Sequence, residues 1–276
     1  MGEAGLTRAA PEGASGGGGT WPPGSLLGEL SESARSRLFS LGAKRQYADS
    51  GRILIREGEN SGLVFLLLAG MVKVSGATDG GEALLAIRIA GDVVGELSAL
   101  DGRPRLATVT TAGAVLARVI GPGEFRGFLA RNPDIALAVT RQVADKLRSA
   151  TARRIDFGTS NVATRFARVL LELADRYGER TPAGTVIRCP LTQTELATLA
   201  AASEPTIQRV LRQLRADGVV TTGYRGTTVL DIAGLRQRAF PEQTEPGLPR
   251  QKPSREGMRG PGRPDDKDGK GGQRAS

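Results

Sequence analysis

Residues 192–218, TQTELATLAAASEPTIQRVLRQLRADG, decide the fold of the C-terminal part of the chain. Thr192 and Glu195 have the spacing of a capping box, in which a hydroxyl and a carboxylate satisfy each other's backbone N–H groups where a helix begins. Ser203 has the position of a second N-cap, and Gly218 ends the helix that follows it. The stretch therefore predicts two short helices joined by a tight turn.

Two short strands are predicted directly after the second helix. Residues 219–222 and 227–230 are rich in valine and threonine and flank a glycine-containing tip. An amphipathic helix over 162–177 and a short strand over 186–189 precede the helix pair. A helix-turn-helix followed by a β-hairpin is the winged form of this motif.

The second helix has an apolar inner face and an outer face rich in arginine. The N-terminal part of such a helix enters the major groove of DNA, where arginine pairs with guanine and glutamine with adenine. A solvated surface that pairs with Asp217 is an equally good interpretation of Arg212 and Arg215. The residues expected at DNA are Thr192, Gln193, Ser203, Glu204, Pro205, Thr206, Gln208, Arg209, Arg212 and, at the tip of the wing, Arg225.

The central region, residues 51–120, has short apolar runs separated by glycine. Strands are predicted over 52–56, 64–68, 71–74, 83–89, 107–110 and 115–119, with a hairpin turn at Asp79–Gly81. Short strands at a spacing of about 8–12 residues are typical of a small barrel or jelly roll.

A long helix is predicted from Asn132, the expected N-cap, with Pro133 as its first residue. Its apolar residues form one stripe, made of Ile135, Val139, Val143, Leu147 and Ala150. The stripe fits either a core helix or one half of a two-helix seam between subunits. The seam is favoured, because a barrel of this size leaves little apolar surface for so long a stripe to bury.

Composition excludes several classes of function. The chain has 276 residues, a formal charge of +9, one cysteine and no histidine. Imidazole metal ligands and His-based catalysis are therefore absent, and Cys189 alone cannot hold an iron–sulfur cluster within one chain. No P-loop and no nucleophile motif occurs, so the sequence predicts neither an enzyme nor a metal site. The basic charge is compatible with a nucleic-acid partner.

The two ends of the chain are predicted to be disordered extensions. Residues 1–25 are rich in glycine and proline, and residues 241–276 are rich in glycine, proline and charge. Such segments cannot bury enough apolar area to offset their ordering entropy. The sequence has no run of 18 apolar residues and no basic-then-apolar leader. It therefore predicts no membrane partner and a cytoplasmic protein.

Further short stretches carry a resemblance to a known family. They are Arg56–Glu59, Gly91–Leu97, Arg105–Val109 and Asn132–Asp134, in this order ahead of the helix-turn-helix. Their order and spacing resemble the cyclic AMP receptor protein family, within the broader catabolite-activator and fumarate–nitrate regulator family.

The resemblance covers nearly all of the part expected to fold and implies an α+β architecture. A cyclic-nucleotide-binding β-roll would occupy residues 26–131, a dimerisation helix 132–158 and a winged helix-turn-helix 159–240. It also implies a homodimeric transcription regulator whose partners are double-stranded DNA and RNA polymerase.

The resemblance further implies a ligand site in the β-roll. Glu96 matches the glutamate that accepts from a ribose 2′-OH, and Arg105 matches the arginine that pairs with a cyclic phosphate. A guanidinium fork suits a phosphate in a sheltered site. The implied ligand-binding residues are Gly95, Glu96, Leu97, Ser98, Arg105, Leu106, Ala107 and Thr151. The alternative is that Glu96 and Arg105 bridge each other across the loop.

Four positions depart from the family's pattern. Leu106 stands where cyclic AMP-binding members often have serine or threonine, and Ala150 replaces one hydroxyl residue of the dimer helix beside Thr151. Glu204–Pro205 replaces an Arg-Glu pair, so the operator sequence is not carried over. Cyclic AMP is the leading effector, with no other cofactor expected. The alternative function is a ligand-independent DNA-binding dimer whose β-roll is only a scaffold.

Overall fold

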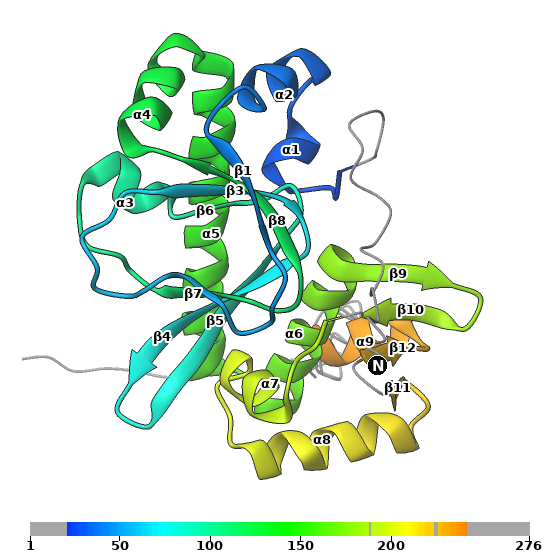
Figure 1. The fold of residues 1–276 in the computed structure, drawn as a ribbon. Helices are drawn as coiled ribbons and strands as arrows, with labels where there is room; N and C mark the ends of the chain where they lie inside the picture. The colour runs from blue at the N-terminus through cyan, green and yellow to red at the C-terminus, as the bar shows by residue number, and fades with distance from the viewer. Residues whose placement is uncertain (1–20, 188, 224–225, 242–276) are drawn as a thin grey trace, which may run out of the picture. The chain divides into compact units, whose positions relative to one another are not determined.

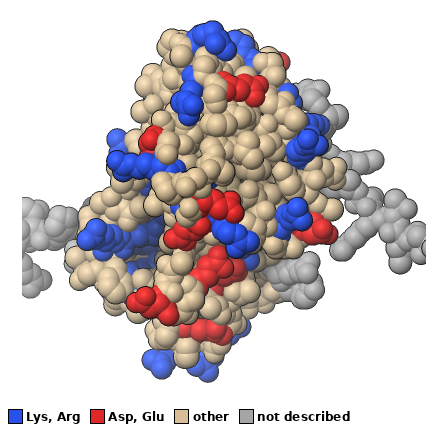
Figure 2. Space-filling model, turned by 60° about the vertical axis from the view of Figure 1, so that its left-hand side comes forward, with Lys and Arg blue, Asp and Glu red and all other residues tan. Residues whose placement is uncertain are grey.

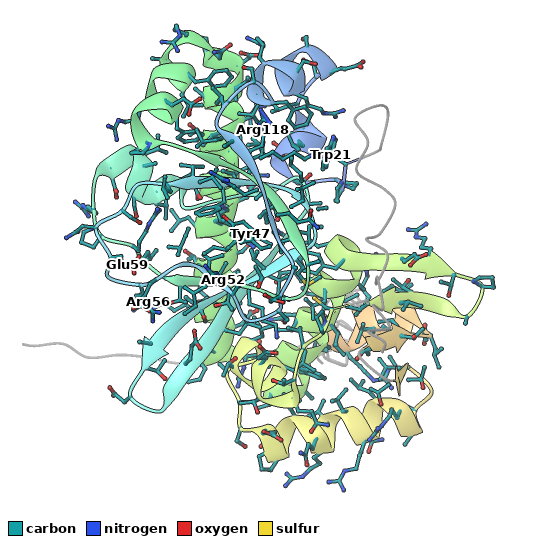
Figure 3. The ribbon with its side chains drawn as sticks, viewed as in Figure 1. Trp21, Tyr47, Arg52, Arg56, Glu59 and Arg118 are labelled. Atoms are coloured by element: carbon teal, nitrogen blue, oxygen red, sulfur yellow. The ribbon has the colours of Figure 1, made fainter. Side chains whose placement is uncertain are left out.

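A computed structural model describes residues 21–187, 189–223 and 226–241. Arg225 of the expected DNA interface therefore lies outside the described residues. Residues 21–25, which the sequence places in the N-terminal extension, are among those described. Ser25 is the N-cap of α1 (Leu26–Glu29), and its Oγ accepts from the Gly28 N–H at 3.1 Å. The Trp21 ring, labelled in Figure 3, packs near Phe39. The centroids of the two rings lie 6.2 Å apart.

Strands β1 to β8 form a β-roll of two four-stranded antiparallel sheets (Figure 1). The first sheet has the order β1 (Ala43–Tyr47), β8 (Val115–Ile120), β3 (Val64–Ala69) and β6 (Val93–Val94). The second has the order β2 (Ile53–Ile55), β7 (Thr108–Thr111), β4 (Met71–Thr78) and β5 (Gly81–Ile89). Both faces of β3 are buried, which explains its unbroken apolar run. Phe65 and Leu67 pack with residues of the second sheet, and Val64 and Leu66 pack under the helices.

The chain passes from the first sheet to the second at Gly70, between β3 and β4. Its φ is +85°, and a Cβ there would lie 2.2 Å from the carbonyl oxygen of Ala114. Glycine alone tolerates both the left-handed backbone and this close approach.

Helices cover the outer face of the β3 sheet. They are α1, α2 (Glu32–Leu38), α4 (Pro122–Arg131) and the start of α5 (Pro133–Thr159), and they share one buried cluster. A short helix, α3 (Glu96–Asp101), lies between β6 and β7. The 27 residues of α5 extend about 40 Å at 1.5 Å per residue. Its beginning is buried at Ile135 and Val139, whereas Leu147 and Phe157 are 66% and 63% exposed.

The C-terminal region folds as a winged helix-turn-helix. Its elements are α6 (Val162–Tyr177), β9 (Gly178–Thr181), β10 (Gly184–Ile187), α7 (Gln193–Leu199), α8 (Glu204–Ala216), β11 (Val220–Gly223), β12 (Gly226–Val229) and α9 (Ile232–Ala239). The sheet has the order β11, β12, β10, β9. Phe166 and Ile207 are fully buried at the centre of this core, which Ile87 of β5 joins. The predicted α+β fold with these parts is confirmed.

Candidate ligand pocket and nucleic-acid interface

The turn between β6 and α3 requires glycine. Gly95 is the N-cap of α3 and has a left-handed φ of +83°. A Cβ there would lie 2.7 Å from the carbonyl oxygen of Leu63 and 2.8 Å from Nη1 of Arg105. The backbone therefore closes directly onto the Arg105 guanidinium.

Arg105 is 3% exposed, and each of its nitrogens donates to a neutral oxygen. Nε donates to Ser61 Oγ at 3.0 Å, Nη1 to the Gly95 carbonyl at 2.8 Å and Nη2 to the Leu63 carbonyl at 2.7 Å. Burial lowers the pKa of Arg105, against the opposite effect of the nearby Glu59 and Glu96 carboxylates. No carboxylate among the described residues forms an ion pair with it, since Glu59 pairs with Arg56 and Glu96 with Lys146. A buried cation without an ionic partner is well placed to receive an anion.

The loop Arg56–Glu59 fixes the backbone of Arg105. The Gly58 N–H donates to the Arg105 carbonyl at 2.9 Å, and the Arg105 N–H donates to the Glu59 carbonyl at 3.0 Å. Figure 3 shows Arg56 and Glu59 at one end of the roll. The two reciprocal bonds place this loop beside Arg105.

Glu96 is 3% exposed and does not bridge to Arg105. Its Oε1 accepts from Nζ of Lys146, on α5, at 2.9 Å, and the same Nζ donates to the Val93 carbonyl at 2.9 Å. Desolvation lowers the pKa of Lys146, while the Glu96 carboxylate opposes that shift. Sequence reasoning missed Lys146, because nothing local marks a lysine whose partner lies 50 residues away.

The remaining expected ligand residues differ in exposure. Ser98 is buried, Ala107 is half-buried, Leu97 is 36% exposed and Leu106 is 73% exposed. Thr151 is exposed on α5, beyond Lys146, and no described hydrogen bond joins it to the cassette. The structure thus brings together Gly95, Glu96 and Arg105 but leaves Thr151 outside their contacts.

The three predicted N-cap residues, Asn132, Thr192 and Ser203, do precede their helices. Only Thr192 also forms the predicted capping hydrogen bonds. Thr192 Oγ1 accepts from the Glu195 N–H at 3.1 Å, and Glu195 Oε2 accepts from the Thr192 N–H at 2.8 Å. Ser203 is the N-cap of α8, but its Oγ lies 2.9 Å from Thr206 Oγ1 instead of on a backbone N–H. Asn132 likewise precedes α5, although its Nδ2 donates back to the Phe128 carbonyl at 2.8 Å.

Arg165 of α6 holds the turn between α7 and α8. Its Nε and Nη2 donate to the carbonyls of Ala200 at 2.9 Å and Ala201 at 3.0 Å. Ala201 has a left-handed φ of +48°, uncommon for a residue with a Cβ. Nη1 of Arg165 donates to the Ser160 carbonyl at 2.6 Å. No local pattern marks this residue, because an arginine on an amphipathic helix is ordinarily a solvated side chain.

The arginines on the outer face of α8 differ in whether they bond to another part of the chain. Arg215 bonds to the wing, while Asp217 pairs with Arg238 at 2.8 Å, so the alternative pairing of Arg215 with Asp217 is not formed. Arg209 and Arg212 are exposed and form no ion pair within the described part of the chain. Their charges remain available to an external anion.

Glu204 links the two helices of the motif. Thr194 Oγ1 donates to Glu204 Oε2 at 2.7 Å, and Gln208 Nε2 donates to Glu204 Oε1 at 3.2 Å. The carboxylate therefore orients the Gln208 amide on the outer face.

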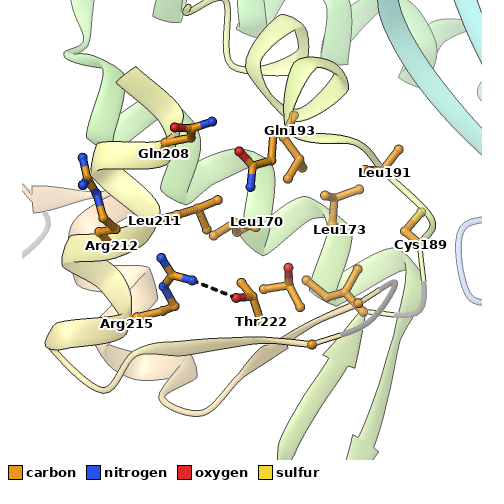
Figure 4. A pocket seen from close by; sticks show the side chains of 15 residues that line it. Leu170, Leu173, Cys189, Leu191, Gln193, Gln208, Leu211, Arg212, Arg215 and Thr222 are labelled. Atoms are coloured by element: carbon orange, nitrogen blue, oxygen red, sulfur yellow. Dashed lines mark hydrogen bonds between the residues drawn. The ribbon is translucent and has the colours of Figure 1, made fainter. Parts of the chain in front are cut away.

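A hollow of about 410 Å³ lies between α8 and the wing strands (Figure 4). Its polar rim is formed by Gln193, Gln208, Arg212, Arg215 and Thr222, and Arg215 Nη1 donates to Thr222 Oγ1 at 3.1 Å. Its apolar floor includes Leu170, Leu173, Leu196, Leu211 and Cys189. Burial raises the pKa of the Cys189 thiol to about 12, and its Sγ lies 3.2 Å from Met71 Sδ. Guanidinium and amide groups at the rim suit phosphate and base edges.

Acidic and basic side chains are intermingled on the face drawn in Figure 2. That face therefore lacks the single-sign charge expected of a broad electrostatic footprint. The exposed arginines of α8 are the better candidates for nucleic-acid contact.

Neither a metal-binding cluster nor a membrane-spanning helix is found in the described part of the chain. Among the described residues, no three cysteine, aspartate or glutamate side chains gather where they could hold a metal ion. No helix in the described ranges combines the length and apolar character that crossing a membrane requires.

Two family models match this chain. The cyclic nucleotide-binding domain matches residues 45–132, and the Crp-like helix-turn-helix domain matches residues 164–238. The first range contains Glu96 and Arg105, and the second contains α7 and α8.

Similar proteins are transcription regulators. The CRP-like cAMP-activated global transcriptional regulator of Mycobacterium tuberculosis (strain ATCC 25618 / H37Rv) is 31% identical over 190 residues, covering 68% of this chain and 85% of that protein. The cAMP-activated global transcriptional regulator CRP of Salmonella typhimurium is 28% identical over 186 residues, covering 66% of this chain and 86% of that protein. A CRP-family transcriptional regulator of Thermus thermophilus has a structure with a TM-score of 0.60 at 26% identity, covering 71% and 96%.

The fold and the matches define a DNA-binding regulator with a cyclic nucleotide-binding domain. The chain belongs to the CRP/FNR family of transcription regulators, which are not enzymes.

Proposed function

We propose that this protein is a cytoplasmic homodimer in which a cyclic nucleotide, cyclic AMP foremost, binds the β-roll and controls sequence-specific binding to double-stranded DNA. One observation carries the ligand proposal. The Arg105 guanidinium is buried without an ionic partner beside the Glu96 carboxylate, which offers a cation for a phosphate and an acceptor for a ribose hydroxyl. The M. tuberculosis and S. typhimurium relatives are described as cAMP-activated, which supports cyclic AMP as the first candidate.

The other pocket residues have supporting roles in this proposal. Backbone N–H groups at Gly95, Leu97 and Ser98 hold ribose and phosphate, with Leu106 and Ala107 at the edge and Thr151 reaching the base from α5. At DNA, Gln208 and Arg209 read base edges. Phosphates are contacted by Thr192, Gln193, Ser203, Thr206, Arg212 and Arg225, near Glu204 and Pro205.

The proposed dimer is formed along α5. Leu137, Leu147, Ile155 and Phe157 on this helix are 51%, 66%, 59% and 63% exposed, and a second copy of the helix would cover them. Ligand binding favours one arrangement of the paired helices over another. It thereby sets the separation of two recognition helices, which must match about 34–36 Å or a multiple of it. RNA polymerase is the further partner in this proposal.

Calorimetric titration of the full chain with cyclic AMP, alongside DNA titrations with and without it, tests the proposal. Saturable cyclic AMP binding and a ligand-dependent gain in affinity for a selected DNA site are expected. Because phosphate contacts release counterions, the DNA affinity falls steeply with salt. Absence of cyclic nucleotide binding would remove the ligand half of the proposal.

The second candidate is a DNA-binding dimer that needs no ligand. It is favoured by the 73% exposed Leu106 in place of a hydroxyl residue, and by the Lys146–Glu96 pair, which satisfies the carboxylate internally. The same DNA titrations separate the two candidates, because this one predicts equal DNA affinity with and without cyclic AMP.

A further inference from the structure

The hollow between α8 and the wing is a second cavity, separate from the proposed nucleotide pocket (Figure 4). Its volume of about 410 Å³ falls in the range of about 300–1,000 Å³ that is usual for ligand pockets. Leu170 and Leu173 of α6 and Leu211 of α8 line its apolar side, and all three are buried. A hydrocarbon group that enters the hollow therefore leaves water for apolar contacts.

The rim of this hollow is positively charged. Arg212 and Arg215 lie three residues apart on α8, a spacing that places both side chains on one face of the helix. Arg215 Nη1 donates to the uncharged Thr222 hydroxyl at 3.1 Å, and neither arginine forms an ion pair within the described part of the chain. No aspartate or glutamate is among the described residues that line the hollow. The rim therefore offers an anion two guanidinium groups that no carboxylate of the lining neutralises.

The carboxylates on α7 and α8 are engaged elsewhere. Glu195 of α7 accepts from Lys73 Nζ at 2.6 Å and from the Thr192 N–H at 2.8 Å. Glu204, at the start of α8, accepts from Thr194 Oγ1 at 2.7 Å. Because these bonds hold both carboxylates, neither competes with an incoming anion for the two arginines at the rim.

We propose that the hollow binds a small amphipathic carboxylate, a ligand additional to the cyclic nucleotide and the DNA of the proposed function. The carboxylate accepts hydrogen bonds from Arg212 and Arg215, because the planar guanidinium matches the geometry of a carboxylate. The hydrocarbon chain lies against the leucines of the hollow, where the burial of each methylene is favourable. An inorganic anion uses only the rim, whereas an amphipathic anion uses both parts of the cavity.

Such a ligand interferes with DNA binding directly. Arg212 is a proposed phosphate contact, and Gln208 at the same rim is proposed to read a base edge. A carboxylate bound to Arg212 occupies its donors and neutralises its charge, so the ligand and DNA compete. This competition takes place within the winged helix-turn-helix and needs no nucleotide in the β-roll.

Calorimetric titration of the full chain with sodium decanoate, below the concentration at which it forms micelles, tests the site without nucleotide or DNA. Saturable binding is expected, with an affinity that rises by up to about fourfold for each methylene from hexanoate to decanoate. Inorganic phosphate should bind more weakly than decanoate. Arg215→Gln should weaken decanoate binding by about tenfold or more, as expected for a hydrogen bond between charged groups. Arg236→Gln removes an exposed arginine of α9 and should bind as the wild type does.

The thiol of Cys189 reports where decanoate binds in the unaltered protein. Cys189 lines the hollow and is the one cysteine of the chain, so its modification is read without ambiguity. Decanoate should slow its reaction with methyl methanethiosulfonate, a small uncharged reagent, and hexanoate at the same concentration should slow it less. This measurement needs no variant, so it stays decisive if Arg215→Gln impairs folding.

Titration of a selected DNA site completes the test. Saturating decanoate should lower the DNA affinity, and sodium chloride at the same concentration controls for ionic strength. The inference is overturned by no saturable decanoate binding, by equal affinities of the wild type and Arg215→Gln, by an unchanged Cys189 reaction, or by an unchanged DNA affinity. Each of these results leaves nucleotide binding in the β-roll untouched, so the proposed function is judged separately by its own titrations.

Discussion

A guanidinium held by carbonyl and hydroxyl oxygens differs chemically from one held in an ion pair. Arg105 is fixed in place by Ser61, Leu63 and Gly95, yet none of these groups neutralises its charge. An anion that reaches it gains a charge-assisted hydrogen bond without first displacing a carboxylate. The cost of ordering the side chain has already been met by the fold.

Arg105→Gln should weaken cyclic AMP binding by roughly 10–100-fold, since a hydrogen bond to a charged group contributes about 1.5–3 kcal/mol. Calorimetry measures the affinity, and a melting curve checks the fold. Arg103→Gln changes an exposed arginine of the same loop and should bind as the wild type does. Equal affinities of the two variants would remove Arg105 from the pocket.

Tyr177→Phe should change how stability depends on pH. Burial raises the pKa of Tyr177 to about 12 from 10.0, so between these values the folded protein keeps a proton that the unfolded chain has lost. The free energy of unfolding therefore falls as pH rises through this window, by up to about 1.4 kcal/mol per pH unit from this group.

The Tyr177→Phe variant loses that part of the slope. It also loses about 1 kcal/mol at neutral pH with the hydrogen bond to the Ile87 carbonyl. Urea titrations at several pH values between about 10 and 12 measure both effects. If the free energy of unfolding of the two proteins changed with pH in the same way, the pKa of Tyr177 would not be raised in the folded protein.

At the scale of elements, a short sequence pattern predicts a feature when the residues that bond to each other lie within one helical turn. The capping box at Thr192 and Glu195 was predicted correctly for this reason, whereas the short strands β6 and β9 were not predicted. β1 was missed because four of its five residues are exposed, so it shows no apolar alternation. It exists because β8 supplies its hydrogen bonds. The segment at α3 was interpreted as a loop, since glycine stands at both of its ends.

Gly95→Ala should destabilise the fold more than Gly102→Ala does. Both positions are left-handed, which costs about 1–2 kcal/mol for a residue with a Cβ. At Gly95 the Cβ also meets backbone and guanidinium atoms within 2.8 Å, whereas at Gly102 nothing lies within 4 Å. Chemical denaturation measures the difference. An equal decrease in the free energy of unfolding for the two variants would show that the atoms around Gly95 move aside at little cost.

Arg209→Ala should relax base preference at one position in each half-site. A bidentate arginine contributes about 1–3 kcal/mol of discrimination against the wrong base. Binding-site selection on randomised DNA reads this out, and Arg236→Ala, an exposed arginine of α9, serves as the control. An unchanged selection profile for Arg209→Ala would mean that Arg209 contacts a phosphate or solvent and not a base.

At the scale of the molecule, the hydrogen bonds around the proposed ligand site join distant parts of the chain. Arg105 reaches Ser61 across 44 residues, and Lys146 reaches Glu96 across 50. Such contacts follow from how sheets and helices pack, which no local pattern encodes. The resemblance supplied Glu96 and Arg105, but not the lysine that holds one of them.

Leu147→Glu should shift the protein from dimer to monomer and lower its affinity for a palindromic DNA site. Leu147 is 66% exposed in the single chain, and a charge there would be buried without a partner in a two-helix seam. Light scattering after size exclusion measures the mass. Arg148→Glu, a neighbouring change on the same helix, should leave the dimer intact. A dimeric Leu147→Glu protein would place the interface away from the exposed apolar residues of α5.

The sheltered sulfur beneath the wing has a practical consequence for spectroscopy. Cys189 is the one cysteine of the chain and is 5% exposed, so maleimides and iodoacetamide react with it slowly. A second cysteine placed at Arg236, on the surface of α9, would take up a spin label or dye selectively. In the proposed dimer, each protomer would then carry a single reporter without prior removal of the native thiol. If the proposed function holds, the separation of the two reporters changes as cyclic AMP is titrated.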